Sequence, residues 1–389
     1  MFESMTVAEV RACAREFARS EIAPIAGDID RSGCFPAATV ARMGKLGFFG
    51  LTLPREYGGA GNTLLHLAAA IEEISGACAS HGITLSTHLT LCAGLIERFG
   101  TIEQKKAYLP DLASGRRLGA FCLTEREAGT DAGSIASRAV PEAGGYRLNG
   151  RKIFITNGGV ADVFVVFAMT GPGQGSKGIS AFIVEKGTPG FSVGGKFEKM
   201  GIRASSTTEI ILENCFVPES SLVGQPGEGF RIAMRSLDEG RIGVAAQALG
   251  IAGAALDSAV SYSKGRIQFG RPVSSNQGIQ WMLADMFLRV RASALLVEHA
   301  ACLRDGGLPF SYAAAMAKLH ASETAMEVCT RAVQLHGGQG YISGTPVERL
   351  MRDAKITEIY EGTSEAQRMI IAAELLKRQS CGISEAENQ

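Results

Sequence analysis

The chain has 389 residues, of which 46% are hydrophobic and 20% are charged. That composition is ordinary for a globular protein, and the length suggests two or three packed units rather than one core. Lys plus Arg and Asp plus Glu both number 39, so the formal net charge is zero. This balance argues against a general nucleic-acid-binding protein, which needs a basic surplus to neutralise phosphates.

No secretory signal and no membrane-spanning run is visible in the sequence. No apolar run approaches the roughly 20 residues needed to cross a bilayer, and residues 1–5 lack the basic start of a secretory signal. We therefore expect no membrane association and a cytoplasmic location, with the mature form of a mitochondrial matrix protein as the alternative. Residues 380–389 are polar and are expected to fray.

Cysteine and histidine residues form no metal-binding pattern. The nine cysteines include no CxxC pair, and the six histidines are scattered without an HExxH motif. We expect free, mostly buried thiols in a reducing compartment and no bound metal.

Residues 1 to about 120 show helical patterns. Residues 6–22 alternate apolar and charged side chains at helical spacing, and residues 62–74 repeat apolar side chains every three or four positions. Pro110 and the pair Ser114-Gly115 are expected to break the pattern. This part of the chain is predicted to form a helical domain.

Between residues 121 and 232 the signal changes to strands. Residues 163–167, 181–184 and 210–212 are rich in β-branched and aromatic side chains. The pairs Asn149-Gly150 and Asn157-Gly158 predict tight turns.

One motif in this zone is misleading. Residues 173–178 match the G-x-G-x-x-G pattern, but they join two predicted strands instead of leading from a strand into a helix. We therefore expect a hairpin loop and no Rossmann-type dinucleotide site.

Helical patterns return after about residue 228. No proline interrupts residues 228–271, and a second long helix is predicted from Ser311 to the pair Gly337-Gly338. Long amphipathic helices with short connections pack as a bundle. The predicted fold class is α+β, with three domains: residues 1–120 helical, 121–232 β, and 233–389 a helical bundle.

Two segments of the β zone carry polar groups suited to a cofactor. Residues 121–134 combine hydroxyls, small residues and glycines, which is typical of either an ordinary loop or a cradle for phosphate and flavin. On a strand, Phe154 and Thr156 would share a face, so one could stack on a planar ring while the other donates a hydrogen bond. The alternative is a half-buried strand with one polar edge.

Glu361 lies between Tyr360 and Gly362 in the segment 352–365. The usual state of a glutamate is a surface charge. A carboxylate in a dry pocket, with its pKa raised towards neutrality, would instead suit the abstraction of a proton.

Taken together, these segments resemble the acyl-CoA dehydrogenase family. The resemblance runs from about Val7 to Lys377, and it is strongest in residues 123–132, 155–158, 237–242, 266–270, 334–338 and 359–364. It implies an N-terminal helical domain, a middle β domain built as a barrel or sandwich, and a C-terminal four-helix bundle. It also implies tightly bound FAD and a homotetramer arranged as a dimer of dimers.

The resemblance assigns a role to individual residues. Glu361 would be the catalytic base. The residues implied in cofactor binding are Cys122, Leu123, Thr124, Gly129, Thr130, Phe154, Ile155, Thr156, Arg266, Phe269, Gln277, Gln334, Gly337, Gly338, Thr363 and Glu365. The residues implied in substrate binding are Thr130, Asp238, Arg241, Tyr360 and Gly362. Thr124, Thr156 and Phe154 would contact the flavin ring. The adenylate part would be held, across a subunit boundary, by Arg266, Phe269, Gln277 and the segment 334–338.

Some relatives place the base elsewhere, at the position that is Gly240 here. Glu239 is adjacent, but one residue turns it by about 100° around a helix, so Glu361 is favoured. This chain also departs from the family pattern in two places, where Arg126 replaces a proline and Gly265 replaces an acidic residue.

The implied activity is the FAD-dependent α,β-dehydrogenation of an acyl-CoA, short-chain or short-branched, to the trans-2-enoyl-CoA. Flavin N5 would accept the hydride, and an electron-transfer flavoprotein would accept the electrons. Arg126 keeps one alternative open, which is the same chemistry on an acyl group held by an acyl or peptidyl carrier protein. A flavin monooxygenase on this fold would usually lack the glutamate, and a non-catalytic scaffold would leave these motifs without a use.

Overall fold

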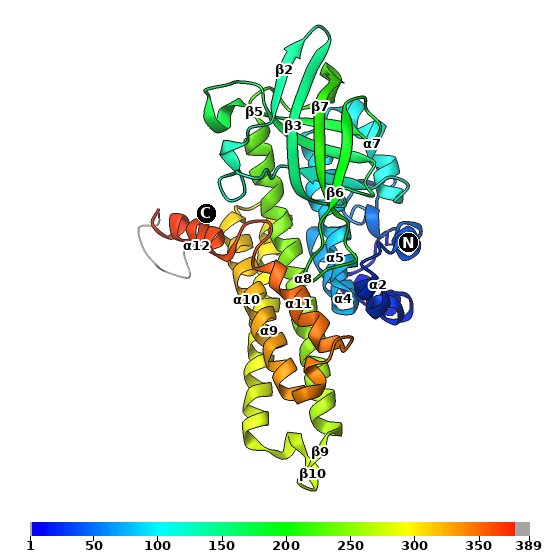
Figure 1. Ribbon diagram of the computed structural model, residues 1–389, viewed down its shortest axis with the longest axis vertical. Coiled ribbons are helices and arrows are strands. Elements are labelled where there is room, and N and C mark those ends of the chain that lie inside the picture. The colour runs from blue at the N-terminus through cyan, green and yellow to red at the C-terminus, as the bar shows by residue number, and fades with distance from the viewer. Residues whose placement is uncertain (1, 378–389) are drawn as a thin grey trace.

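The computed structural model describes residues 2–377. The predicted frayed tail, residues 380–389, lies outside them. Figure 1 shows a β-sheet at one end of the molecule, long helices running away from it, and the N-terminal helices packed alongside.

Seven α-helices form the N-terminal region. They are α1 (Val7–Phe17), α2 (Ala26–Ser32), α3 (Ala37–Leu46), α4 (Leu64–Ala77), α5 (Ala79–Ser86), α6 (Gly94–Phe99) and α7 (Ile102–Ser114). Two π-helical segments, Ala18–Ile22 and Thr87–Ala93, continue α1 and α5. The predicted helices over residues 6–22 and 62–74 are therefore confirmed.

Pro110 does not end a helix, contrary to the prediction. It lies inside α7, which continues to Ser114 and ends where Gly115 adopts φ 70°. A proline inside a helix removes a single N–H donor. Here Leu109 and Leu112, both buried, hold the helix against the core on either side of the proline.

The middle region is one eight-stranded sheet. Its strands are β1 (Gly119–Cys122), β2 (Arg138–Glu142), β3 (Gly145–Thr156), β4 (Val163–Met169), β5 (Ile179–Glu185), β6 (Phe191–Lys196), β7 (Thr207–Pro218) and β8 (Leu222–Val223). Their order is β6-β7-β3-β2-β4-β5-β8, with β1 paired to β4. The strands predicted over residues 163–167, 181–184 and 210–212 are confirmed.

The glycine motif at residues 173–178 lies in the loop between the antiparallel strands β4 and β5, with a short 3₁₀ turn at Gly175–Gly178. This confirms the predicted hairpin loop. The motif opens no helix, so it lacks the context of a dinucleotide site.

The turn predicted at Asn149-Gly150 is wrong. Both residues lie within β3, at a shift in its register with β7. Gly150 has φ 153°, and a Cβ there would lie 2.1 Å from the Oγ of Ser137, so the glycine serves close strand packing. The turn predicted at Asn157-Gly158 is confirmed, with Asn157 at φ 64°.

Five helices form the C-terminal region. They are α8 (Gly229–Gly265), α9 (Gln277–Asp305), α10 (Ser311–His336), α11 (Pro346–Thr357) and α12 (Ser364–Leu375). The predicted bounds of α10 are confirmed. A small hairpin of β9 (Ile267–Gln268) and β10 (Arg271–Pro272) joins α8 to α9, at the opposite end of the long helices from the sheet (Figure 1).

Helix α8 is the central element of the molecule. Within residues 2–377 it is the one helix long and apolar enough to cross a membrane, but 78% of its apolar window is buried in the protein. Small residues bring its neighbours close, because a Cβ at Gly250 would lie 2.1 Å from the carbonyl oxygen of Glu72 on α4. The buried face of α10 is similarly small, with Ala314, Ala317 and Ala321 in the core. Such tight contacts fix α8 relative to α4 and α10.

Candidate active site

Glu361 lies in the short turn that joins α11 to α12. Its backbone is left-handed, with φ 53°, and Gly362 follows with φ 96°. A glutamate in this conformation costs about 1–2 kcal/mol relative to the right-handed region. Both carboxylate oxygens are buried, and neither has a hydrogen-bond partner among the described residues. A strained backbone therefore directs an unpaired carboxylate into the protein.

The carboxylate of Glu361 lies directly against α8. A Cβ built on Gly240 would lie 1.9 Å from Glu361 Oε2 and 3.0 Å from Leu91 Cδ2. The absence of a side chain at Gly240 thus creates the room that the carboxylate fills. Leu91, from the π-helical segment Thr87–Ala93, forms an apolar wall of the same space.

Glu239, the neighbour of Gly240, points elsewhere. Its Oε1 pairs with Arg98 and accepts from Arg304 Nε at 2.8 Å. Both groups that contact the Glu239 carboxylate are cations. Glu239 is therefore held in ion pairs and is unsuited to removing a proton. Glu239 therefore points away from the space that the Glu361 carboxylate fills beside Gly240, as the turn of about 100° per residue predicts.

Burial sets the electrostatics of Glu361. Removal from water raises the pKa of its carboxyl to about 7, while the charges of Arg241 and Lys318 act in the opposite direction. A carboxylate whose pKa lies near neutral pH is ionised when needed yet basic enough to accept a proton.

Lys318 on α10 is a site residue that the sequence analysis missed. Its side chain is fully buried, and its Nζ donates to the carbonyl oxygen of Gly362 at 2.7 Å. The available signal was a lysine on the apolar face of a helix, between Ala314 and Ala321. Gln367 on α12 was missed as well, and its Nε2 donates to the same carbonyl at 2.9 Å.

Asp238 and Arg241 are buried and pair with each other on α8. Ser311 Oγ donates to Asp238 Oδ1 at 2.9 Å, and Arg241 Nε has no partner among residues 2–377. Tyr360 donates its hydroxyl to Gln247. The five residues assigned to the substrate thus include three that are tied into the bundle next to Glu361, and their contact with a substrate stays a prediction.

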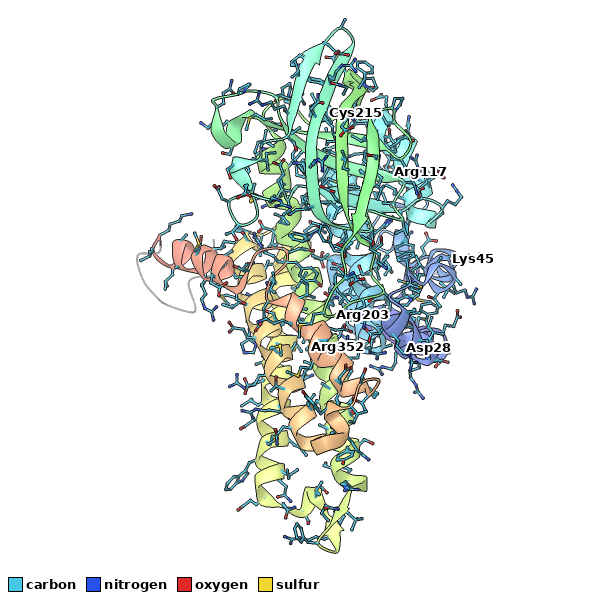
Figure 2. All side chains as sticks on the ribbon, in the orientation of Figure 1. Asp28, Lys45, Arg117, Arg203, Cys215 and Arg352 are labelled. Atoms are coloured by element: carbon cyan, nitrogen blue, oxygen red, sulfur yellow. The ribbon has the colours of Figure 1, made fainter. Side chains whose placement is uncertain are left out.

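Helix α11 carries the turn of Glu361 and is fixed to the N-terminal region. Arg352, labelled in Figure 2, pairs with Asp30 of α2 at 2.7 Å and donates to the carbonyl of Met200 at 3.0 Å. Buried Asp353 accepts a hydrogen bond from the N–H of Ile202. The turn therefore starts from a firmly held helix.

The loop after β1 is anchored by a buried ion pair. Lys152 Nζ donates to Glu125 Oε1 at 2.7 Å and to the carbonyl of Leu123 at 3.1 Å. Glu125 also accepts from the N–H groups of Ala136 and Ser137, at 2.6 and 3.0 Å. The carbonyl of Thr124 accepts from the N–H of Ile153 at 2.9 Å, which ties the loop to β3.

The predicted flavin residues on this loop and on β3 are exposed to different degrees. Cys122 and Leu123 are buried, so their main chain is the part that could reach a cofactor, whereas Gly129 and Thr130 are exposed. Phe154 is 59% exposed with φ 57°, next to buried Ile155. A register shift between Lys152 and Ile155 interrupts the strand alternation from which a shared face for Phe154 and Thr156 was inferred.

A cavity of about 560 Å³ gathers a second group of predicted cofactor residues. Arg266, Gln334, Gly337 and Gly338 line it, together with other residues of α8, α9 and α10. A Cβ at Gly337 or Gly338 would meet nothing within 4 Å, so the glycines leave open space beside the cavity.

The remaining predicted cofactor residues lie outside this cavity. Phe269 is fully exposed at the tip of the β9–β10 hairpin, and Gln277 is exposed at the start of α9. Thr363 caps α12 by accepting from the N–H of Ala366 at 3.3 Å, and Glu365 is exposed in the same helix. Within one chain, the predicted cofactor residues therefore form three separate groups. One lies on the sheet, one at α12 and one at the far end of the long helices.

The eight described cysteines are free thiols, of which Cys78, Cys92, Cys122, Cys215 and Cys329 are buried. Within the described residues, no three His, Cys, Asp or Glu side chains group in a way that could hold a metal ion.

Sequence profiles of one family match nearly the whole chain. The N-terminal, middle and C-terminal domains of acyl-CoA dehydrogenase match residues 5–116, 120–215 and 227–376. The short-chain-specific acyl-CoA dehydrogenase of Clostridium acetobutylicum is 53% identical over 95% of this chain and 97% of its own length.

Two solved structures share the fold. The butyryl-CoA dehydrogenase of Megasphaera elsdenii has a TM-score of 0.94 and 46% identity, covering 97% of this chain and 100% of that one. A chain in the structure described as the electron transferring flavoprotein of Acidaminococcus fermentans has a TM-score of 0.95 and 50% identity, with the same coverage of 97% and 100%. This chain belongs to the acyl-CoA dehydrogenase family.

Proposed function

We propose that this protein is an FAD-dependent dehydrogenase that converts a short-chain acyl-CoA into the trans-2-enoyl-CoA. The observation that carries the proposal is the buried, unpaired carboxylate of Glu361, held in a strained turn against Gly240. An orphaned buried acceptor costs free energy unless a ligand or reaction uses it. The proton of a thioester α-carbon is the group that this base would take.

The protein's contribution to the reaction is positional and electrostatic. Glu361 receives the proton from C2, and burial keeps water away from it. Arg241 and Lys318 oppose the rise in its pKa, so that the carboxylate form is populated at neutral pH. Charge develops on the thioester oxygen as the proton leaves, and the main-chain N–H of Glu361, in the same turn, is a candidate donor to it. When bound, FAD would accept the hydride from C3.

The residues present fit a flavin. Thr124, held by the anchored loop, and Thr156 offer hydroxyls, and Phe154 offers an exposed ring for stacking. The cavity beside Arg266 and Gln334 offers an arginine and an amide to the polar adenylate part. Because these groups lie far apart in one chain, we propose that the cofactor spans two subunits.

Assembly into a homotetramer follows from the same proposal. Helix α9 exposes Trp281, Leu288 and Leu295 at intervals of seven residues, each 60% exposed or more. Such a stripe is suited to packing against another helix. Phe269, fully exposed at the hairpin tip, would likewise be covered by another subunit. An electron-transferring flavoprotein is the proposed electron acceptor, and a cytoplasmic location remains our expectation.

The carrier-protein alternative is not favoured. The full-length relatives that share about half of their residues with this chain are named for acyl-CoA substrates. Arg126, which prompted the alternative, is an exposed residue.

The experiment is a comparison of flavin bleaching in the purified, yellow protein. Butyryl-CoA should bleach the flavin absorbance under anaerobic conditions, whereas the same butyryl group on an acyl carrier protein should leave it largely unchanged. A series of longer acyl-CoAs defines the chain length, with the fastest bleaching expected at four carbons. A protein isolated without flavin, or bleached by the carrier-bound substrate alone, would contradict the proposal.

A further inference from the structure

The carbonyl oxygens of residues 361 and 362 accept hydrogen bonds from side chains on two different helices. Lys318 Nζ of α10 donates to the Gly362 oxygen at 2.7 Å, and Gln367 Nε2 of α12 donates to the same oxygen at 2.9 Å. Gln367 Nε2 also lies 3.3 Å from the Glu361 carbonyl oxygen. Two side chains that take no direct part in the reaction therefore donate hydrogen bonds to this one short turn.

The turn needs such support because its backbone is unfavourable. Two consecutive residues, Glu361 and Gly362, have positive φ angles, and a non-glycine residue reverts from this region unless its surroundings hold it there. If Glu361 reverted, its carboxylate would leave the space beside Gly240. The donors to its flanking carbonyls are what oppose this change.

Burial makes the choice of lysine informative. The Lys318 side chain is fully buried, and its hydrogen bond is made to a carbonyl and not to a carboxylate. A buried ammonium without a directly bonded counter-charge is costly. Burial accordingly lowers the pKa of Lys318 to about 8, whereas the nearby Glu361 charge favours the protonated form. A neutral amide could donate the same hydrogen bond with a smaller desolvation cost. We therefore infer that the positive charge of Lys318 has a function of its own, which is to act on the Glu361 carboxylate.

Charged side chains from several packed elements surround Lys318 and Glu361. Arg241 faces both groups from α8, Glu358 follows α11, and Glu365 lies on α12. The segment Thr87–Ala93 presents apolar Leu91. Among residues 2–377, Lys318 and Arg241 are thus the two cations that act on the carboxylate of Glu361.

We propose that Lys318 is a positioning residue for the catalytic base, holding the 361–362 turn together with Gln367 and supplying a positive charge near the Glu361 carboxylate. This inference rests on the proposed role of Glu361. It separates two contributions: the hydrogen bonds hold the geometry, and the ammonium favours the ionised base.

The test uses Lys318→Met in the flavin-loaded enzyme with butyryl-CoA. Methionine has a similar length and no donor or charge. We expect kcat to fall by about tenfold to a hundredfold, because a misplacement of about 1 Å has an effect of that size, with KM and flavin content nearly unchanged. The acid limb of the pH profile should move to higher pH by about one unit, because a positive neighbour has been removed.

Gln367→Leu is the matched variant, since it removes a donor to the same carbonyl without changing charge. We expect a lower kcat and an unmoved acid limb. Ser322→Ala, which alters a buried hydroxyl one turn further along α10 and bonded to the Leu319 carbonyl, is the control and should keep both values.

The outcomes distinguish the electrostatic role of Lys318, its positioning role and the proposed function of the protein. An unmoved acid limb in Lys318→Met overturns the electrostatic role, and an unchanged kcat in Lys318→Met or Gln367→Leu overturns the positioning role. If Lys318→Met does not fold, Gln367→Leu still tests the turn. If Glu361→Gln turns over normally, the proposed function itself fails, whereas an inactive Glu361→Gln beside a normal Lys318→Met removes this inference alone.

Discussion

The carboxylate of Glu361 and the α-carbon of Gly240 share one small space, since a single added methyl group at Gly240 would lie 1.9 Å from Glu361 Oε2. The two residues are 121 positions apart in the chain and come from α8 and from the turn before α12. The family resemblance implied a base at the position of Gly240 in some relatives, and the contact seen here means that a side chain at either position would reach the same space.

This contact gives the first prediction. Gly240→Ala should displace the Glu361 carboxylate, since the added Cβ overlaps an oxygen and Leu91 closes the other side. We expect kcat with butyryl-CoA to fall by about a hundredfold. Gly253→Ala on the same helix, where a Cβ meets nothing within 4 Å, is the control and should keep full activity. Equal activity of the two variants would argue against the contact.

The acid side of the pH profile follows from the burial of Glu361. Its carboxyl has a pKa raised to about 7, and only the ionised form can accept a proton. We therefore expect kcat/KM to rise with pH through about 7 and then level off. A stopped-flow measurement of flavin bleaching across pH 5–9 checks this. A limb near 4.5, the ordinary value for glutamate, would mean that the base is exposed to water.

Removing the charge of Glu239 and removing the charge of Glu361 should change the free energy of unfolding in opposite directions. Glu239→Gln breaks ion pairs with Arg98 and Arg304 and leaves two partly buried cations without that counter-charge, which should lower the free energy of unfolding by about 2 kcal/mol. Glu361→Gln removes a carboxylate whose ionisation opposes folding. The folded-state pKa of Glu361 is raised, so its contribution to stability declines as pH rises from about 4.5 through about 7.

Thermal unfolding at pH 5 and pH 8 distinguishes these cases. Glu361→Gln should exceed the parent by a small margin at pH 5 and by a larger one at pH 8, whereas Glu239→Gln should unfold at a lower temperature at both. A loss of stability at pH 8 in Glu361→Gln would show that the carboxylate is paired after all.

Much of the fold was predictable because it follows from local pattern. Apolar spacing predicts the helices α4, α8 and α10, and β-branched runs predict β4, β5 and β7. Local signals failed where tertiary packing overrides them. Asn149-Gly150 has the composition of a turn, but Ser137 needs the space that a side chain at Gly150 would fill. Pro110 has the chemistry of a helix breaker, but buried leucines hold α7 on both sides of it.

The site was predicted in part for a related reason. Glu361 and Gly240 were both identified through the family resemblance, but their contact joins distant segments and could not be deduced from spacing. Lys318 and Gln367 donate hydrogen bonds to main-chain carbonyls of the 361–362 turn. No sequence pattern predicts the left-handed backbone of that turn. The role of such residues becomes visible only when the helices that carry them are placed around that turn.

Single-turnover bleaching by butyryl-CoA, compared between the parent enzyme and Glu361→Gln, tests the central claim most directly. Glutamine keeps the size of the side chain and cannot take the α-proton. We predict that the variant retains its flavin and binds butyryl-CoA, as a spectral shift of the flavin would report, but bleaches at least about a thousandfold more slowly. Bleaching at the parental rate would contradict the assignment of Glu361 as the base.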